Sequence, residues 1–188
     1  MPHELEIRYD LTAEELLDAL NRRFRARVTL EGAVAEVHLE KRLKDLLDRG
    51  IITEYKPYDM DGYPDFEIWV PLRQEPLKIE CKNVRDSEEA YREGGQIVAY
   101  KVETQKTRAS KGDKSSRYYD CCYFDILAVC LGKKTNDWRQ FLFCRTADLQ
   151  INSEFSNKLN VMQRVPLPES EDLSFWFSDI GELLKAHY

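Results

Sequence analysis

The predicted fold depends on two stretches of sequence, DFEIWV at residues 65–70 and LKIECK at residues 77–82. Apolar and polar residues alternate in both stretches, which is the pattern of strands with one buried face. The connector between them is short and contains Pro71 and Pro76, so we expect the two strands to form a β-hairpin.

The register of this hairpin determines which charged side chains meet. A turn centred on residues 73–74 sets Asp65 opposite Lys82 and Glu67 opposite Glu80 in an antiparallel pair. The apolar side chains then share the core face: Phe66, Ile68, Val70, Leu77, Ile79 and Cys81. The charged side chains converge on the other face, where oxygen ligands suit a hard divalent cation. The same alternation is also typical of a hairpin with one solvated face and a stabilising Asp–Lys pair.

Hydrophobic periodicity assigns the remaining elements. Thr12 and Glu15 form a capping box for a helix over residues 12–24. An apolar stripe predicts a second helix over about residues 33–49, after Gly32. The other assignments are strands at 51–58, 124–131, 138–145 and around 160–167, a loop over 108–117 and a closing helix near 178–188. The segment 97–107 is compatible with a helix or a long strand, and we favour the helix. This order predicts a single α/β domain over residues 1–188, with a mixed central sheet flanked by helices.

Composition narrows the class of protein. The chain has 188 residues, 43% of them hydrophobic, which is enough to bury a full core. No apolar run reaches the length of a membrane span, and the first ten residues lack the apolar region of a secretory signal, so we expect a cytoplasmic protein with no membrane partner. Five cysteines form no CxxC pair and the three histidines lie far from them, which disfavours a zinc site.

The charge distribution bears on nucleic-acid binding. A net charge of -6 argues against a nucleic-acid partner when the chain is taken as a whole. The segment from Lys101 to Arg117, however, carries six basic and two acidic side chains, a local net charge of +4. A basic segment of this kind either keeps the protein soluble or follows a phosphate backbone.

Pro64-Asp65, followed by Glu80-Cys81-Lys82, resembles the PD-(D/E)XK motif of the restriction-endonuclease-like nucleases. In that superfamily the Asp begins one strand and Glu-x-Lys ends the next. The expected element order over about residues 33–131 is also similar to the αβββαβ core of the superfamily, and the type II restriction nucleases in particular. The helix at 12–24 and residues 132–188 would then be extensions of this core.

The resemblance implies a metal-dependent DNA endonuclease that hydrolyses phosphodiester bonds and serves restriction or defence. It implies Asp65, Glu80, Lys82 and Glu36 as catalytic residues. The implied ligands of Mg²⁺, for which Mn²⁺ can substitute, are the carboxylates of Asp65, Glu80 and Glu36 and the carbonyl of Cys81. Glu40, one helical turn after Glu36, competes with it for the role of helix ligand.

The resemblance also extends to DNA contacts. Gln96 and Tyr100 match a QxxxY pattern of related exonucleases and would share a helix face. The expected phosphate contacts are Lys106, Arg108, Lys111, Lys114 and Arg117. Three alternatives stay open: a repair or recombination nuclease for junctions or mismatches, a non-catalytic nucleic-acid-binding subunit of the same fold, and an acidic protein-interaction domain. Double-strand cleavage with one active site per chain favours a homodimer, although no sequence feature identifies its interface.

Overall fold

The predicted hairpin is present as β2 (Phe66–Trp69) and β3 (Leu77–Asn83), which pair antiparallel. A computed structural model describes residues 1–60, 62–86, 89–106 and 114–188. The chain divides into two units, residues 1–34 and residues 35–188. The hairpin and every described candidate site residue belong to the second unit.

The register of the hairpin differs from the expected one by two residues. Phe66 pairs with Ile79 and Glu67 with Lys78, so the turn is centred between Leu72 and Arg73. Leu72 has a φ of 70°, and the amide of Arg73 donates to the carbonyl of Val70. A turn with a positive φ at its third position usually contains Gly there, and for this reason the sequence did not reveal it. A shift of two residues keeps each side chain on its expected face.

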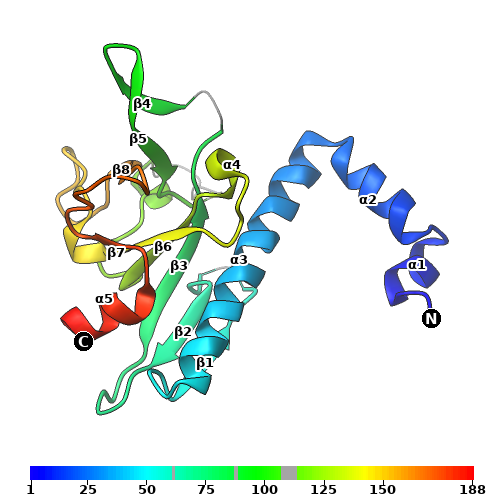
Figure 1. The fold of residues 1–188 in the computed structure, drawn as a ribbon, viewed down its shortest axis with the longest axis horizontal. Helices are drawn as coiled ribbons and strands as arrows, with labels where there is room; N and C mark the ends of the chain where they lie inside the picture. The colour runs from blue at the N-terminus through cyan, green and yellow to red at the C-terminus, as the bar shows by residue number, and fades with distance from the viewer. Residues whose placement is uncertain (61, 87–88, 107–113) are drawn as a thin grey trace. The chain divides into compact units, whose positions relative to one another are not determined.

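The hairpin lies in a mixed six-stranded sheet with the order β1-β2-β3-β6-β7-β9 (Figure 1). β3 and β6 are parallel, whereas the other neighbours are antiparallel. The remaining strands of this sheet are β1 (Glu54–Pro57), β6 (Ile126–Cys130), β7 (Phe141–Arg145) and β9 (Trp176–Phe177). A second sheet has the order β4-β5-β8, formed by β4 (Ala90–Glu93), β5 (Gln96–Glu103) and β8 (Met162–Pro166). The fold is therefore α/β with a mixed sheet, and the hairpin of β6 and β7 is confirmed.

Each face of the six-stranded sheet has its own hydrophobic core. On one face, leucines of α3 (Phe24–Asp48) and α5 (Ile180–His187) pack against β2, β3 and β6. On the other face, Leu127 and Val129 pack with Val102 of β5 and Val165 of β8. The run ILAVC of β6 is buried on both faces, which explains why it is continuously apolar. Short helical turns follow at α4 (Gly132–Thr135) and η2 (Thr146–Asp148).

The helix expected over 33–49 is present but begins earlier, and the segment expected as a further helix forms a strand. α3 begins at Phe24 and runs through Gly32 without a break, because a single glycine costs a long helix only about 1 kcal/mol. The described residues of the segment 97–107 do not form a helix: residues 96–103 form β5, which pairs with β4 through a turn at Gly94 and Gly95, both with positive φ. The connection between β3 and β6 is thus made of strands over its described residues, and the expected αβββαβ order fails at this position.

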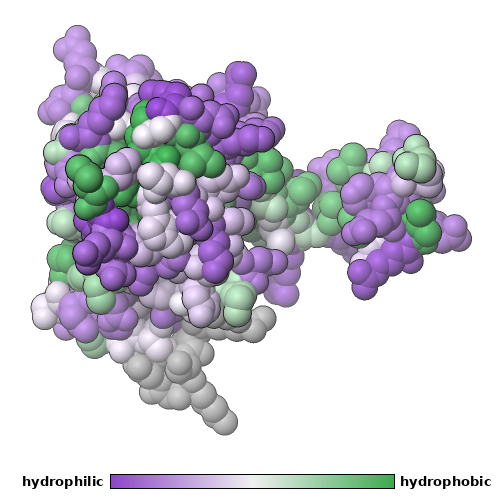
Figure 2. Space-filling view, turned by 90° about the horizontal axis from the view of Figure 1, so that it is seen from below, coloured by the Kyte–Doolittle hydropathy of each residue, from purple (hydrophilic) through white to green (hydrophobic). Residues whose placement is uncertain are grey.

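The first unit contains α1 (Glu4–Tyr9), α2 (Ala13–Asn21) and the start of α3. Thr12 caps α2 with Glu15 as the sequence predicts. No side chain of α1 or α2 is buried, and large apolar residues such as Ile7 and Leu17 are exposed; Figure 2 shows hydrophobic patches among mostly hydrophilic residues on this unit. In the described part of the chain, no helix has the length and apolar character needed to cross a membrane.

Candidate active site around Lys82

Glu80 and Lys82 project from β3 on the face opposite to α3, and this face is covered instead of solvated. Glu80 is only 3% exposed, because the second core packs over it. The ammonium of Lys82 donates a hydrogen bond to Glu80 Oε1 over 2.5 Å. The hydroxyl of Tyr119 donates to the same oxygen, also over 2.5 Å. One carboxylate oxygen of Glu80 therefore receives two donors.

The second carboxylate oxygen, Glu80 Oε2, is buried and has no hydrogen-bond partner among the described residues. A buried carboxylate oxygen without a donor is costly, because it has lost its water and gained nothing in return. Such an atom in a native fold calls for an explanation, and an oxygen ligand for a cation is one of the standard ones.

Asp65 lies just beyond the last residue pair of the hairpin, opposite Glu80 by continuation of the register. Its Oδ2 accepts a hydrogen bond from the amide of Cys81 over 2.7 Å. The N–H and C=O of one residue in a strand point to the same side, so the carbonyl of Cys81 faces the side on which Asp65 lies. Burial and the nearby charge of Glu80 raise the pKa of Asp65 to about 7.

Glu36 approaches the same group of side chains from α3. Burial raises the pKa of Glu36, the ammonium of Lys82 opposes this shift, and the carboxylates of Asp59 and Glu80 add to it. Glu40 is placed differently, since its carboxylate accepts a hydrogen bond from the hydroxyl of Tyr55 over 3.3 Å. Of the two glutamates that compete for the helix position, Glu36 is the one that lies near Lys82.

The state of Lys82 follows from its surroundings. Burial alone would lower the pKa of its ammonium, but Glu80, Tyr119 and Asp65 outweigh burial and raise the pKa above its ordinary value. Lys82 therefore keeps its proton and acts as a fixed positive charge among carboxylates. We call Glu36, Asp65, Glu80 and Lys82 the carboxylate cluster.

Tyr119 is the member of this site that sequence reasoning missed. It is 5% exposed, and burial raises the pKa of its hydroxyl, as does the charge of Glu80. The Lys82 ammonium lies 5.8 Å from the centre of its ring. Tyr119 is 39 residues from Glu80 in sequence, and its only sequence signal is the aromatic pair that it forms with Tyr118 after the basic segment.

The five basic residues expected to contact phosphates fall into three groups. Lys106 and Arg117 are joined by a backbone hydrogen bond, and the Lys106 ammonium lies 4.8 Å from the ring centre of Tyr123, which contacts Tyr119. Lys114 begins η1 (Lys114–Arg117), whereas Arg108 and Lys111 lie outside the described residues.

Gln96 and Tyr100 are not brought together as predicted. They lie at different positions along strand β5 instead of on one helix face, and four residues of a strand span about 13 Å. Tyr100 is half-buried, with the ammonium of Lys134 at 5.8 Å from its ring centre. Among the described residues, neither Gln96 nor Tyr100 contacts the carboxylate cluster.

The donor set of the cluster suits a small, hard cation. No three His, Cys, Asp or Glu side chains within the described ranges stand close enough together to hold a metal ion by themselves. Mg²⁺ does not require that arrangement, because it usually keeps several waters and binds protein through one or two carboxylates. Two carboxylate oxygens fit this mode of binding: Glu80 Oε2, and the oxygen of Asp65 that does not bond to the Cys81 amide. Both are hard oxygen donors.

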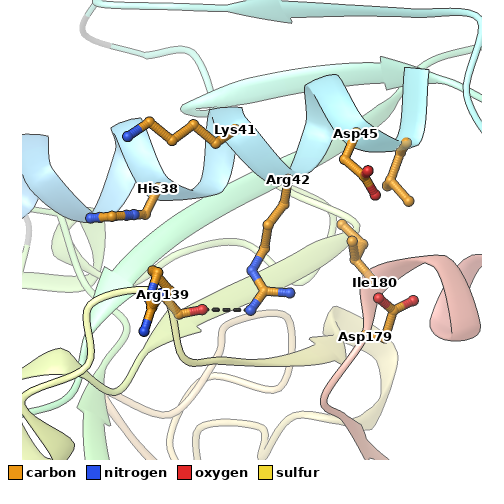
Figure 3. A pocket seen from close by; sticks show the side chains of 8 residues that line it. His38, Lys41, Arg42, Asp45, Arg139, Asp179 and Ile180 are labelled. Atoms are coloured by element: carbon orange, nitrogen blue, oxygen red, sulfur yellow. Dashed lines mark hydrogen bonds between the residues drawn. The ribbon is translucent and has the colours of Figure 1, made fainter. Parts of the chain in front are cut away.

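Two cavities lie away from the carboxylate cluster. One of about 320 Å³ lies between α3 and the start of α5 (Figure 3). Three of its charged residues already have partners within the protein: Arg42 donates to the carbonyl of Arg139, Asp45 pairs with Arg49, and Asp179 caps α5. A second cavity, of about 350 Å³, is lined by residues of β8, such as Gln163 and Arg164, and by residues between 170 and 176 that follow it. Neither includes a residue of the carboxylate cluster.

Comparison with known proteins gives little beyond the geometry. No family model matches the sequence, and no curated protein matches it. Among solved structures, a bacterial homing endonuclease matches with a TM-score of 0.46 and 16% sequence identity, over 78% of this chain and 81% of the other. A likeness at this level does not assign a function, so the functional argument rests on the carboxylate cluster itself.

Proposed function

We propose that this chain is a metal-dependent DNA endonuclease, with a PD-(D/E)XK-type site formed by the carboxylate cluster. The observation that carries the proposal is Glu80 Oε2, a buried oxygen that no donor among the described residues reaches, beside Asp65 and Lys82. Carboxyl groups with perturbed pKa values around a partly buried lysine are a known sign of a functional site.

The balance of charge supports a divalent cation. Three carboxylates, those of Glu36, Asp65 and Glu80, surround the single ammonium of Lys82. If all are ionised, the cluster carries a net charge of -2, which one divalent cation would neutralise. Burial is the main cause of the raised pKa values of Asp65 and Glu36, and the neighbouring carboxylates add to both shifts.

Glu80 and Asp65, with the carbonyl of Cys81, would hold Mg²⁺ or Mn²⁺, and Glu36 would add its negative charge from α3. A cation bound there supplies Lewis-acid polarisation of a phosphoryl oxygen and lowers the pKa of a bound water. Because Lys82 stays protonated, its task is to offset the negative charge that builds on the phosphoryl oxygens, and it is not a general base in this state.

The basic segment supplies the contacts to DNA in this proposal. Lys106 and Arg117 would contact phosphates, together with Arg108, Lys111 and Lys114, and binding should therefore weaken as salt increases. We further propose a role in restriction or defence, and a homodimer for double-strand cleavage. Genetic context and the oligomeric state in solution test these two points.

Cleavage of supercoiled plasmid with Mg²⁺ or Mn²⁺ tests the function. Asp65→Asn and Lys82→Ala should each lower the nicking rate by about 100-fold or more, as expected for loss of a charged group at the reacting centre. Glu36→Gln should also lower it. Glu40→Gln is the matched control, one helical turn away and bonded to Tyr55, and should cleave as the wild type does. Equal rates for wild type and Lys82→Ala would refute the assigned role of Lys82.

A non-catalytic DNA-binding subunit is the competing function. It predicts no cleavage of any DNA with either metal, and no Mn²⁺ binding that depends on Asp65 or Glu80. Titration calorimetry with Mn²⁺ on the wild type and Glu80→Gln separates the two functions, because the nuclease must bind the ion through Glu80.

A further inference from the structure

Two tyrosine rings project from the segment between β1 and β2. Tyr58 and Tyr63 stack with ring centres 5.0 Å apart and planes within 14° of parallel. The ammonium of Lys56 lies 4.7 Å from the ring centre of Tyr58. Tyr63 is 49% exposed, and its hydroxyl has no hydrogen-bond partner in the part of the chain that the structure describes. An aromatic pair placed for core packing alone would be buried.

Several hydrogen bonds hold this pair in place. The Tyr58 hydroxyl donates to Glu67 Oε2 over 2.5 Å, and the Tyr58 amide donates to the carbonyl of Asp65 over 2.9 Å. The hydroxyl of Tyr123 donates to the carbonyl of Tyr63 over 3.2 Å. Hydrogen bonds therefore hold Tyr58 and the backbone of Tyr63 in place, which reduces the entropy lost when a ligand binds to the exposed ring.

The pair is continuous with the candidate active site. The Tyr123 ring lies 4.8 Å from the ring of Tyr119, whose hydroxyl bonds to Glu80. Lys106 covers Tyr123 with its ammonium 4.8 Å from the ring centre. We call Tyr58, Tyr63 and Tyr123, with Lys56 and Lys106, the tyrosine ridge. The ridge leads from an exposed ring to within one residue of the carboxylate cluster.

An exposed aromatic ring, stacked on a second ring and close to ammonium groups, matches one ligand chemistry well. Unpaired bases stack on aromatic side chains whatever their sequence, and the lysines contact the phosphates between them. A paired base in a duplex has both faces covered by its neighbours, so it cannot stack on Tyr63 unless the helix is opened. The ridge therefore selects for nucleotides that are already unpaired.

We propose that the tyrosine ridge binds unpaired nucleotides of a DNA strand beside the carboxylate cluster, so that the preferred substrates are single-stranded, flapped or mismatched DNA and not plain duplex. The inference deepens the proposed function and rests on it for cleavage, whereas binding of the unpaired strand stands on the ridge alone.

Fluorescence anisotropy with labelled oligonucleotides, in EDTA, tests the binding. The full chain should bind a single strand and a flapped duplex more tightly than a blunt duplex of equal length. Tyr63→Ala should weaken binding of the unpaired DNA by about tenfold or more, and leave blunt duplex unchanged. Tyr63→Phe should restore wild-type affinity, because the ring and not the hydroxyl stacks.

Tyr9→Ala is the matched control, since Tyr9 is 55% exposed and lies in the first unit. It should bind every DNA as the wild type does, and circular dichroism should show Tyr63→Ala folded. Equal affinity of the wild type for single strand and duplex would overturn the proposal, as would equal weakening of both by Tyr63→Ala.

Failure of the ridge and failure of the nuclease proposal give different results. If Lys82→Ala cleaves normally but Tyr63→Ala loses affinity for unpaired DNA, the ridge stands and the assigned role of Lys82 falls. If Lys82→Ala abolishes cleavage while Tyr63→Ala binds and cleaves flapped DNA as the wild type does, the active site stands and the ridge falls.

Discussion

Asparagine in place of Asp65 should stabilise the metal-free protein at alkaline pH. Burial and the charge of Glu80 raise the pKa of this carboxyl from 3.8 to about 7. The asparagine side chain would keep an oxygen to accept the hydrogen bond from the Cys81 N–H, and it removes the charge that the buried position disfavours. The substitution therefore isolates the cost of ionising Asp65.

The sign and the size follow from the two pKa values. Between about pH 4 and pH 7 the unfolded chain releases the Asp65 proton while the folded chain holds it, so the free energy of unfolding of the wild type falls as pH rises. A difference of one in pKa between the folded and unfolded chain changes the free energy of unfolding by about 1.4 kcal/mol. The wild type should thus lose about 4 kcal/mol relative to Asp65→Asn between pH 4 and pH 8.

Urea unfolding of both proteins in EDTA, at pH 4, 6 and 8, measures this difference. The stability of Asp65→Asn minus that of the wild type should be small at pH 4 and grow until about pH 7, then level off. A difference that is the same at all three values would refute the account of a buried, crowded carboxyl at position 65. Asp45→Asn is the control, since the Asp45 carboxylate is exposed and pairs with Arg49.

Three further changes test other parts of the structure by urea unfolding. Leu72→Gly should stabilise the protein by about 0.5 to 1 kcal/mol, since Leu72 is fully exposed and has a φ of 70°; a loss of stability would argue against the observed turn. Gly132→Ala should destabilise it by about 1 to 3 kcal/mol, because a Cβ there would lie 2.5 Å from the Trp138 ring; an unchanged midpoint would contradict this packing. Lys82→Ala should cost about 3 to 5 kcal/mol by leaving the buried Glu80 charge without its partner, and adding Glu80→Gln should recover part of it; no recovery would mean that the loss is not electrostatic.

Much of the fold followed from hydrophobic periodicity. The alternation in DFEIWV and LKIECK placed β2 and β3 and put the correct side chains on the core face. The continuous apolar run of β6 and its hairpin with β7 were also predicted. These segments were predicted correctly because burial of one face gives alternating apolar residues, and burial of both faces gives a continuous apolar run.

The elements that were predicted incorrectly have no such pattern, or have one that fits both a helix and a strand. The segment 96–103 has apolar residues compatible with either helix or strand, and the deciding signal was Gly94-Gly95, which forms the two-residue turn to β4. The register of the β2–β3 hairpin depended on Leu72 adopting a conformation that leucine rarely takes. Neither propensity nor periodicity indicates such a choice.

Part of the candidate site could also be predicted from the sequence, and part could not. Asp65, Glu80 and Lys82 were found because they lie on one hairpin, where strand geometry brings them together. Tyr119 was not found, because tertiary packing alone places it against Glu80. The burial of Glu80 was missed for a related reason: the sequence of β3 alternates, but the second sheet and its loops cover the polar face.

A crystal structure of the protein soaked with Mn²⁺, with anomalous data, tests the central claim most directly. The account predicts one strong anomalous peak at about 2.2 Å from Glu80 Oε2 and an oxygen of Asp65, and no such peak in crystals of Glu80→Gln. Ordered electron density for Glu80 still bonded to Lys82 and Tyr119, with no peak beside Oε2, would contradict it.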